Sequence, residues 1–246
     1  MMAASATLKD EEMSEPNGGW QADCEFAGLR LKSAFQAIHD LEAGAVLGHS
    51  ARVRAWREAD AVPPAQLFDD TRPDTEIVRL DRLCRVLHAT NYNAEAPQPT
   101  RLLVPVHPRL LESVTADHGR VYRDTLNGSG LSGARIVICL PDPSHLRTMS
   151  LGYLIGSYRL HGFEIAVHLR HPGGLKDLLA RTRPTFILLD SRQFPDPLTM
   201  AAAILVAQES GSRPVFTMVE TETVAGQIRD LGGKLAQGYY FDRLAA

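Results

Sequence analysis

Thr185–Asp190 (TFILLD) is a short, almost wholly apolar run that ends in a carboxylate, and similar apolar runs recur along the chain. Several of these runs are rich in valine, isoleucine and leucine without polar alternation, which is typical of strands buried on both faces. The other runs are Leu102–Val106, Arg135–Leu140, Phe163–Leu169, Pro214–Val219 and Lys234–Phe241. Together they predict the strands of one buried sheet.

Mixed segments that can hold helices separate these runs. Leu198–Ser210 (LTMAAAILVAQES) is the clearest, because alanine and leucine favour helix and Gly211 follows its end. Ser144–Leu160 and Thr223–Leu231 are also expected to be helical. Repeated strand–helix units at this spacing predict a parallel sheet with crossover helices. A doubly wound open sheet and a closed barrel both fit this periodicity.

The carboxyl ends of the predicted strands are the expected place for functional residues. In parallel α/β structures of either kind, ligands bind at those ends. The residues found there are Ser50, Pro105, His107, Cys139, His168, Asp190, Thr217 and Gln237.

The composition of the 246-residue chain favours a globular protein of the cytoplasm. Its hydrophobic fraction of 44% is ample for a core, and its net charge of −3 argues against direct nucleic-acid binding, which needs a basic excess or stripe. No apolar run reaches the roughly 18 residues that a membrane span needs. The acidic segment Lys9-Asp10-Glu11-Glu12 is unlike a signal peptide. We therefore expect neither membrane association nor nucleic-acid binding.

The chain is predicted to consist of an N-terminal tail and one domain. Residues 1–21 are polar, include Pro16-Asn17-Gly18-Gly19, and indicate a flexible tail. Residues 22–246 are expected to form a single domain, since an α/β barrel routinely fills this length alone. Cys24, Cys84 and Cys139 are odd in number and widely spaced, so they indicate neither a disulfide framework nor a zinc motif.

Several segments carry a resemblance to a known family. Phe35-Gln36-Ala37-Ile38 and Val46–Trp56 (VLGHSARVRAW) resemble the start of bacterial EAL domains, whose usual text is FQPI and then GYEALxRW. The family's VHP, AEGVET and QGYxF stretches are similar to Val106-His107-Pro108, Val215–Thr221 and Gln237–Phe241. The resemblance covers most of the chain, from about residue 24 to residue 241, and implies an α/β fold with a single TIM-like (β/α) barrel.

The resemblance also shows where the family's chemistry is missing. EAL domains hydrolyse the second messenger cyclic di-GMP with two divalent metal ions, which generate hydroxide and neutralise the phosphate. Ions of the magnesium or manganese type need mainly carboxylate ligands. The family's metal-ligand, lysine and next glutamate positions are occupied here by Ser50, Pro105, Cys139, His168, Leu169, Leu188 and Thr217. The resemblance therefore implies a member that is not an enzyme, with no catalytic residue, metal or cofactor.

Four residues that match the family pattern are candidates for binding cyclic di-GMP: Gln36, Arg54, Asp190 and Gln237. Arg54 is expected to pair with a phosphate through its guanidinium fork. Because the lost carboxylates would repel a dianionic ligand, their replacement is compatible with binding that needs no metal. It is equally compatible with a pocket that binds nothing. Arg54 could instead pair with a carboxylate at the barrel rim, and Gln237 could simply satisfy backbone groups.

The leading hypothesis is a catalytically inactive EAL-domain regulator in cyclic di-GMP-linked signalling (motility or biofilm control), which acts on a regulatory protein partner. The alternative is an effector that binds cyclic di-GMP without metal. A third hypothesis is a phosphodiesterase with a rebuilt metal site, because imidazole suits zinc, nickel or copper. The histidines at or near strand ends are His49, His107, His168 and His171, without a tight motif such as HExxH. A homodimer is a further expectation inherited from the family.

Overall fold

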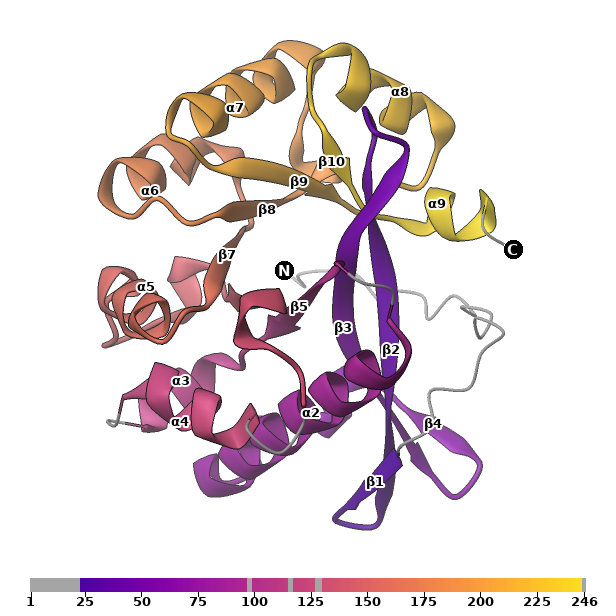
Figure 1. Cartoon of the computed structure of the whole chain (residues 1–246), viewed down its shortest axis with the longest axis vertical. Helices are drawn as coiled ribbons and strands as arrows, with labels where there is room; N and C mark the ends of the chain where they lie inside the picture. The colour runs from indigo at the N-terminus through magenta and orange to yellow at the C-terminus, as the bar shows by residue number, and fades with distance from the viewer. Residues whose placement is uncertain (1–22, 97–98, 115–116, 127–129, 245–246) are drawn as a thin grey trace, which may run out of the picture.

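A long antiparallel hairpin of β2 (Leu29–Asp40) and β3 (Ala45–Arg57) organises the fold (Figure 1). The computed structural model describes residues 23–96, 99–114, 117–126 and 130–244. One face of the hairpin packs on helix α2 (Asp74–Glu95) through residues such as Leu31 and Ala55. The opposite face of the hairpin is therefore left for the inside of the barrel.

Eight of the described strands close a barrel in the order β2-β10-β9-β8-β7-β6-β5-β3, with β3 pairing back to β2. Strand β2 runs antiparallel to both of its neighbours, and the other neighbouring strands of the barrel run parallel to one another. The remaining strands are β5 (Arg101–Pro105), β6 (Ile136–Leu140), β7 (Glu164–Leu169), β8 (Phe186–Asp190), β9 (Arg213–Thr217) and β10 (Leu235–Ala236). The predicted single α/β domain with a TIM-like barrel is confirmed. We call the end where the parallel strands finish the mouth.

Strands β2 and β3 continue beyond the mouth, where two short strands flank them. β1 (Asp23–Phe26) pairs with β2, and β4 (Asp60–Val62) pairs with β3 (Figure 1). The turn from β1 to β2 is Ala27-Gly28, with φ of 49° and 75°, the left-handed values that a tight two-residue hairpin turn requires. The result is a four-stranded antiparallel extension that carries residues of the hairpin out of the barrel.

Helices cover the outside of the barrel (Figure 1). Helix α7 (Pro197–Glu209) confirms the clearest helix prediction, and Asp196 caps it by accepting the N–H of Thr199 at 2.9 Å. The other α-helices are α1 (Pro64–Leu67), α3 (Pro108–Ser113), α4 (His118–Leu126), α5 (Leu151–Leu160), α6 (Leu175–Arg181), α8 (Glu222–Asp230) and α9 (Tyr239–Leu244). The 3₁₀ turns are η1 (Gly133–Arg135), η2 (Pro143–His145), η3 (Pro172–Gly174) and η4 (Ser191–Gln193). None of the helices in the described part of the chain is long and apolar enough to cross a membrane.

The prediction that Lys234–Phe241 is one strand is wrong at its C-terminal end. Strand β10 ends at Ala236, and α9 begins at Tyr239. The backbone of Gly238 lies directly against the backbone of Val219, and the N–H of Tyr240 donates to the Val219 carbonyl at 3.1 Å. These backbone contacts turn the chain out of the sheet and into the helix.

The predicted helix Ser144–Leu160 is shorter in the structure. Its first residues lie in η2, where Asp142 accepts the N–H of Ser144 at 2.8 Å, and α5 begins only at Leu151. An aspartate that caps a local turn offers the backbone an alternative to helix, which explains the delayed start. The predicted helix Thr223–Leu231 is confirmed by α8, which starts and ends one residue earlier.

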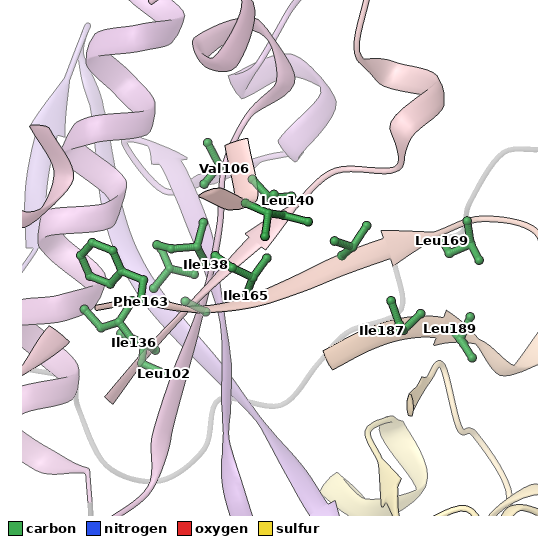
Figure 2. Packing of buried hydrophobic residues seen from close by; sticks show 14 of the residues in the cluster. Leu102, Val106, Ile136, Ile138, Leu140, Phe163, Ile165, Leu169, Ile187 and Leu189 are labelled. Carbon is green, nitrogen blue, oxygen red and sulfur yellow. The ribbon is translucent and has the colours of Figure 1, made fainter. Parts of the chain in front are cut away.

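Both faces of the barrel strands are buried, which explains why their sequences lack polar alternation. In β6, Ile136 and Ile138 pack against the helices, whereas Val137 and Cys139 face the barrel interior. Figure 2 shows part of the outer cluster, in which Phe163 and its neighbours lie between strands and helices. The interior cluster consists of Ile38, Leu103, Val137, Cys139, Ala166, Phe186, Leu188, Val215 and Leu235. This apolar interior forms the floor of the mouth.

The contact between Gly238 and Val219 can be tested by adding one methyl group. Gly238→Ala is expected to lower the free energy of unfolding by about 1–3 kcal/mol, because a Cβ there overlaps the Val219 backbone. Urea unfolding followed by circular dichroism measures the change. Gly156→Ala in α5 is the matched control: its Cβ meets no atom within 4 Å, so alanine is expected to stabilise the helix by about 0.5–1 kcal/mol. An unchanged stability of Gly238→Ala would contradict the close packing.

Candidate functional site

A cavity of about 540 Å³ opens at the mouth of the barrel. Its lining includes Ser50, Arg52, Pro105, Cys139, His168, Leu169, Arg170, Leu188, Asp190, Arg192, Thr217 and Gln237. All the strand-end residues predicted from the sequence are in this set except His107. Its ring stacks on Phe68 at 5.0 Å, and it lines a second, smaller cleft between the barrel and α2. Seven of the eight strand-end residues thus meet at one cavity, whereas His107 follows β5 but faces the other cleft.

A chain of polar side chains crosses the barrel seam beside the cavity. The hydroxyl of Ser50 donates to Oε1 of Gln237 at 3.0 Å, and Nε2 of Gln237 donates to Oε1 of Gln36 at 3.0 Å. Nε2 of Gln36 in turn donates to the carboxylate of Asp242 in α9 at 2.7 Å. The guanidinium of Arg52 donates to Oε1 of Gln36 at 3.2 Å. These bonds connect β3, β2, α9 and the residue that follows β10.

The two glutamines of the candidate site are thus engaged inside the protein. Gln237 is only 2% exposed and Gln36 only 9%, and the carbonyl and amino groups of both side chains have partners. In this arrangement they brace the closure of the barrel. For either glutamine to contact a ligand directly, one of these internal hydrogen bonds would have to be replaced by a hydrogen bond to the ligand.

Asp190, the third candidate, faces the cavity but is paired with a cation. Arg192 donates to its carboxylate from Nε at 3.0 Å and from Nη2 at 2.8 Å, and the Arg192 N–H adds a further bond at 3.0 Å. Burial opposes ionisation of Asp190, but the hydrogen bonds from Arg192 outweigh it and hold the carboxyl pKa below its usual value. The charge of this carboxylate is therefore largely balanced before any ligand arrives.

Arg54, the fourth candidate, stands at the rim rather than in the cavity. It follows Ser50 and Arg52 at two-residue intervals along β3, so the three side chains share the barrel face of the strand. The side chain is exposed, and among the described residues it has neither a hydrogen bond nor an ion pair. An ion pair between Arg54 and a carboxylate at the rim was the alternative considered from the sequence. No such pair is present in the described part of the chain.

The sequence analysis did not identify the charged partners of Asp190 and Gln36, which are Arg192 and Asp242. Arg192 follows Asp190 by two positions in a tight turn, a spacing that could have indicated the pair. Asp242 was hidden, because the segment before it was expected to be a strand and not the start of α9. A third carboxylate, Asp142, is 8% exposed and accepts the Arg170 N–H at 2.6 Å, so it ties two mouth loops together.

His168 and Cys139 are titratable groups of the mouth whose pKa values are strongly shifted. Although the His168 ring opens onto the cavity, protein atoms surround it, and this burial together with the nearby charge of Arg52 lowers its pKa to about 4. The imidazole is therefore neutral at pH 7. Burial also raises the pKa of the Cys139 thiol, so that group stays protonated.

The residues of the mouth do not fit the two divalent ions that the family resemblance implies. Hard ions need several converging oxygen ligands, mainly carboxylates. At those positions the cavity offers a hydroxyl, a protonated thiol and a neutral imidazole, while Asp190 is bound to Arg192. Among the residues described, no group of three or more histidine, cysteine, aspartate or glutamate side chains is placed to hold a metal ion.

The histidines of the rebuilt-metal hypothesis are dispersed. His168 and His171 line the cavity. The ring of His49 lies on the outer side of β3, where its Nδ1 is 3.0 Å from the hydroxyl of Tyr92. His107 accepts the N–H of Arg109 at 3.3 Å in the cap of α3. These two histidines belong to the helix layer and do not converge with the other two.

The fold and the mouth define a barrel protein with a polar cavity at the strand ends. A sequence model of the EAL domain matches residues 24–243. The chain therefore belongs to the EAL-domain family. No curated protein matches the chain.

Solved EAL structures share this fold at low sequence identity. Klebsiella pneumoniae BlrP1, in a manganese and cyclic di-GMP complex, is 19% identical with a TM-score of 0.73, over 89% of this chain and 57% of that one. Bacillus subtilis YkuI, in complex with cyclic di-GMP and calcium, is 20% identical with a TM-score of 0.74, over 86% and 55%. A standalone EAL protein of Vibrio cholerae is 17% identical with a TM-score of 0.69, over 85% and 90%. The chain thus spans less than two thirds of BlrP1 and YkuI but most of the Vibrio protein.

The charge environment of His168 leads to a pH prediction. Its imidazole is expected to titrate well below pH 6.5, and Arg52→Leu is expected to move the titration upward because one of the two main causes of the shift is removed. Since the folded-state pKa is lower than the unfolded one, the contribution of His168 to stability is present above pH 6.5 and is lost as the pH falls toward 4. NMR titration of ring protons, assigned with His168→Gln, measures the pKa. A value at or above 6.5 would contradict the described mouth.

Proposed function

We propose that this chain is a catalytically inactive EAL-domain protein that regulates cyclic di-GMP-linked signalling (motility or biofilm control) by contact with a regulatory protein. One observation carries the proposal. The residues at the family's metal-ligand, lysine and glutamate positions converge on one cavity, and none of them is a carboxylate or a lysine. The barrel is therefore retained as a scaffold while its metal chemistry is not.

The remaining groups of the cavity are poor substitutes for the lost chemistry. Efficient general bases have a pKa near the working pH, and His168, with a pKa of about 4, is a weak base at pH 7. The Asp190 carboxylate is committed to Arg192. The Ser50 hydroxyl lies beside an amide, Gln237, that cannot accept its proton. Activation of water in this cavity is accordingly unsupported.

A second candidate function, a metal-independent cyclic di-GMP effector, is favoured by the charge of the mouth. Arg52 and Arg170 line the open cavity, Arg54 stands free at its rim, and Arg192 balances Asp190. A dianionic ligand in this mouth meets these cations and does not meet the carboxylates of active family members, whose positions are uncharged here, so it needs no metal to shield it. A structure of BlrP1 with cyclic di-GMP and no metal ions gives a precedent in a protein of the same fold.

The proposal assigns the function to residues 22–246 as one domain. The predicted tail, residues 1–21, lies outside the residues that the structure describes. A homodimer is likewise proposed only from the family resemblance.

The first prediction from this proposal concerns turnover. Purified protein incubated with cyclic di-GMP and magnesium or manganese is expected to release no linear dinucleotide, as measured by chromatography. Ser50→Glu restores one carboxylate and is expected to remain inactive, because two ions need ligands from several strands. Product that chelators suppress and His168→Ala abolishes would support the rebuilt metal site instead.

The second prediction separates the effector from the scaffold. If cyclic di-GMP binds, calorimetry is expected to give the same affinity with and without magnesium, and Arg54→Ala is expected to weaken it by at least about tenfold, or roughly 1.4 kcal/mol. Arg57→Ala is the matched control, because Arg57 pairs with Asp60 in the extension on the other face of β3. Absence of binding in the wild type would remove the effector and leave the protein-binding scaffold. Strict dependence on a metal ion would contradict both.

A further inference from the structure

The second cleft, of about 200 Å³, lies on the outside of the barrel between β3, α2 and the loop that follows β5. Among the described residues, Pro105 is the only one that lines both this cleft and the mouth. Because side chains alternate along a strand, Arg52 of β3 faces the mouth while Val53 faces the cleft. Strand β3 therefore forms part of the wall between two separate cavities.

Most of the surface of this cleft is apolar or aromatic. Val53, Val106 and Pro108 contribute aliphatic groups. The rings of Phe68 and His107 stack at 5.0 Å with an angle of 10° between their planes, and they form one side of the cleft. An apolar cavity of about 150 Å³ can hold benzene, so a cleft of about 200 Å³ has room for roughly six to ten non-hydrogen atoms.

A buried ion pair supplies the polar part of the cleft. Nε of Arg85 lies 2.7 Å from the Asp81 carboxylate, and each side chain is at most 5% exposed. Asp81 also accepts the N–H of His107 at 2.8 Å, and the Arg85 guanidinium lies 4.4 Å from the centre of the Tyr122 ring. Nη1 of Arg85, by contrast, has no hydrogen-bond partner within the described residues. A buried donor without an acceptor is destabilising, so an acceptor atom in the cleft would offset this cost.

The charge balance of the cleft favours a neutral ligand. Asp81 and Arg85 neutralise each other. Burial lowers the pKa of His88 to about 3 and is also the main reason why the pKa of His107 is below its ordinary value, so both rings are neutral at pH 7. An anion would lose its hydration here without gaining an unbalanced cation. A carbonyl oxygen is an acceptor that avoids this cost.

We propose that this cleft is a binding site for a small, neutral, mainly apolar molecule, about as large as a substituted benzene, that carries one carbonyl or similar hydrogen-bond acceptor. The apolar walls hold the body of the molecule, and Arg85 donates to its acceptor atom. The site is independent of the function proposed for the mouth, because the two cavities share no charged or titratable residue among those described.

Two probes of similar shape test the chemistry of the site. Acetophenone carries a neutral carbonyl acceptor, and benzoate has nearly the same outline with a negative charge. His88 and His107 line the cleft, so their ring protons report on it in proton NMR. His168 and His171 line the mouth and report on that cavity instead. Acetophenone is expected to shift the two signals of the cleft saturably, with an apparent Kd of about 1 mM or below and at least about tenfold tighter than benzoate.

The role of Arg85 has its own readout, the carbonyl stretch of bound acetophenone. A hydrogen bond from a charged donor lowers that frequency, so infrared difference spectra are expected to place the band of the bound probe below its position in hexane. An unshifted band would overturn the assignment of Arg85 as the donor.

Matched variants locate the site on one side of β3. Val53→Phe and Val46→Phe place the same side chain on the same strand, the first in the cleft and the second at an exposed position that lines neither cavity. Val53→Phe is expected to weaken acetophenone binding by at least about fivefold because it fills the cleft, whereas Val46→Phe leaves the binding within about twofold. Circular dichroism shows whether both variants fold. If Val53→Phe does not, the two probes on the wild-type protein still decide.

Three results would overturn the proposal. The first is a shift confined to the two histidines of the mouth, or no saturable shift at the two histidines of the cleft. The second is equal binding of benzoate and acetophenone, which would contradict the preference for a neutral ligand. The third is an equal effect of the two valine variants on acetophenone binding, which would place the probe outside the cleft.

Discussion

Strand β2 closes the barrel, and the geometry of the mouth depends on that closure. It runs antiparallel to β3 along almost its whole length but meets β10 over only two residues. At this short seam the side chains of Ser50, Gln237 and Gln36 are hydrogen-bonded in series. A satisfied polar network in a partly buried seam fixes one arrangement of the strands, because any other leaves buried amides unpaired.

The same hairpin determines the electrostatics of the mouth. Because side chains alternate along β3, closure that places Ser50 in the cavity also places Arg52 beside it and Arg54 at the rim. These cations, and the pairing of Asp190 with Arg192, give the mouth a positive character. Carboxylates are what a hydrolytic metal site needs, and cations are what a metal-free anion site needs. The described mouth offers the cations and lacks the converging carboxylates, and this supports the proposed regulatory or binding role.

The sequence predicted the fold and the cavity more fully than the bonds within the site. Buried strands without polar alternation and the EAL-like segments were sufficient for the barrel and for the convergence of Ser50, Pro105 and Thr217. The engagement of Gln36 with Asp242 was not accessible, because it depends on the turn at Gly238 that starts α9. Such partners are far apart in sequence, and only the folded chain brings them together.

The central claim is that the mouth has lost its metal site, and a titration of manganese(II) followed by electron paramagnetic resonance tests it directly. Free manganese gives a sharp signal that binding removes. The account predicts that the signal rises in proportion to the added ion, as in buffer, with no saturable loss at micromolar concentrations. Saturable loss of one or two ions per chain, abolished by His168→Ala or Asp190→Asn, would contradict it.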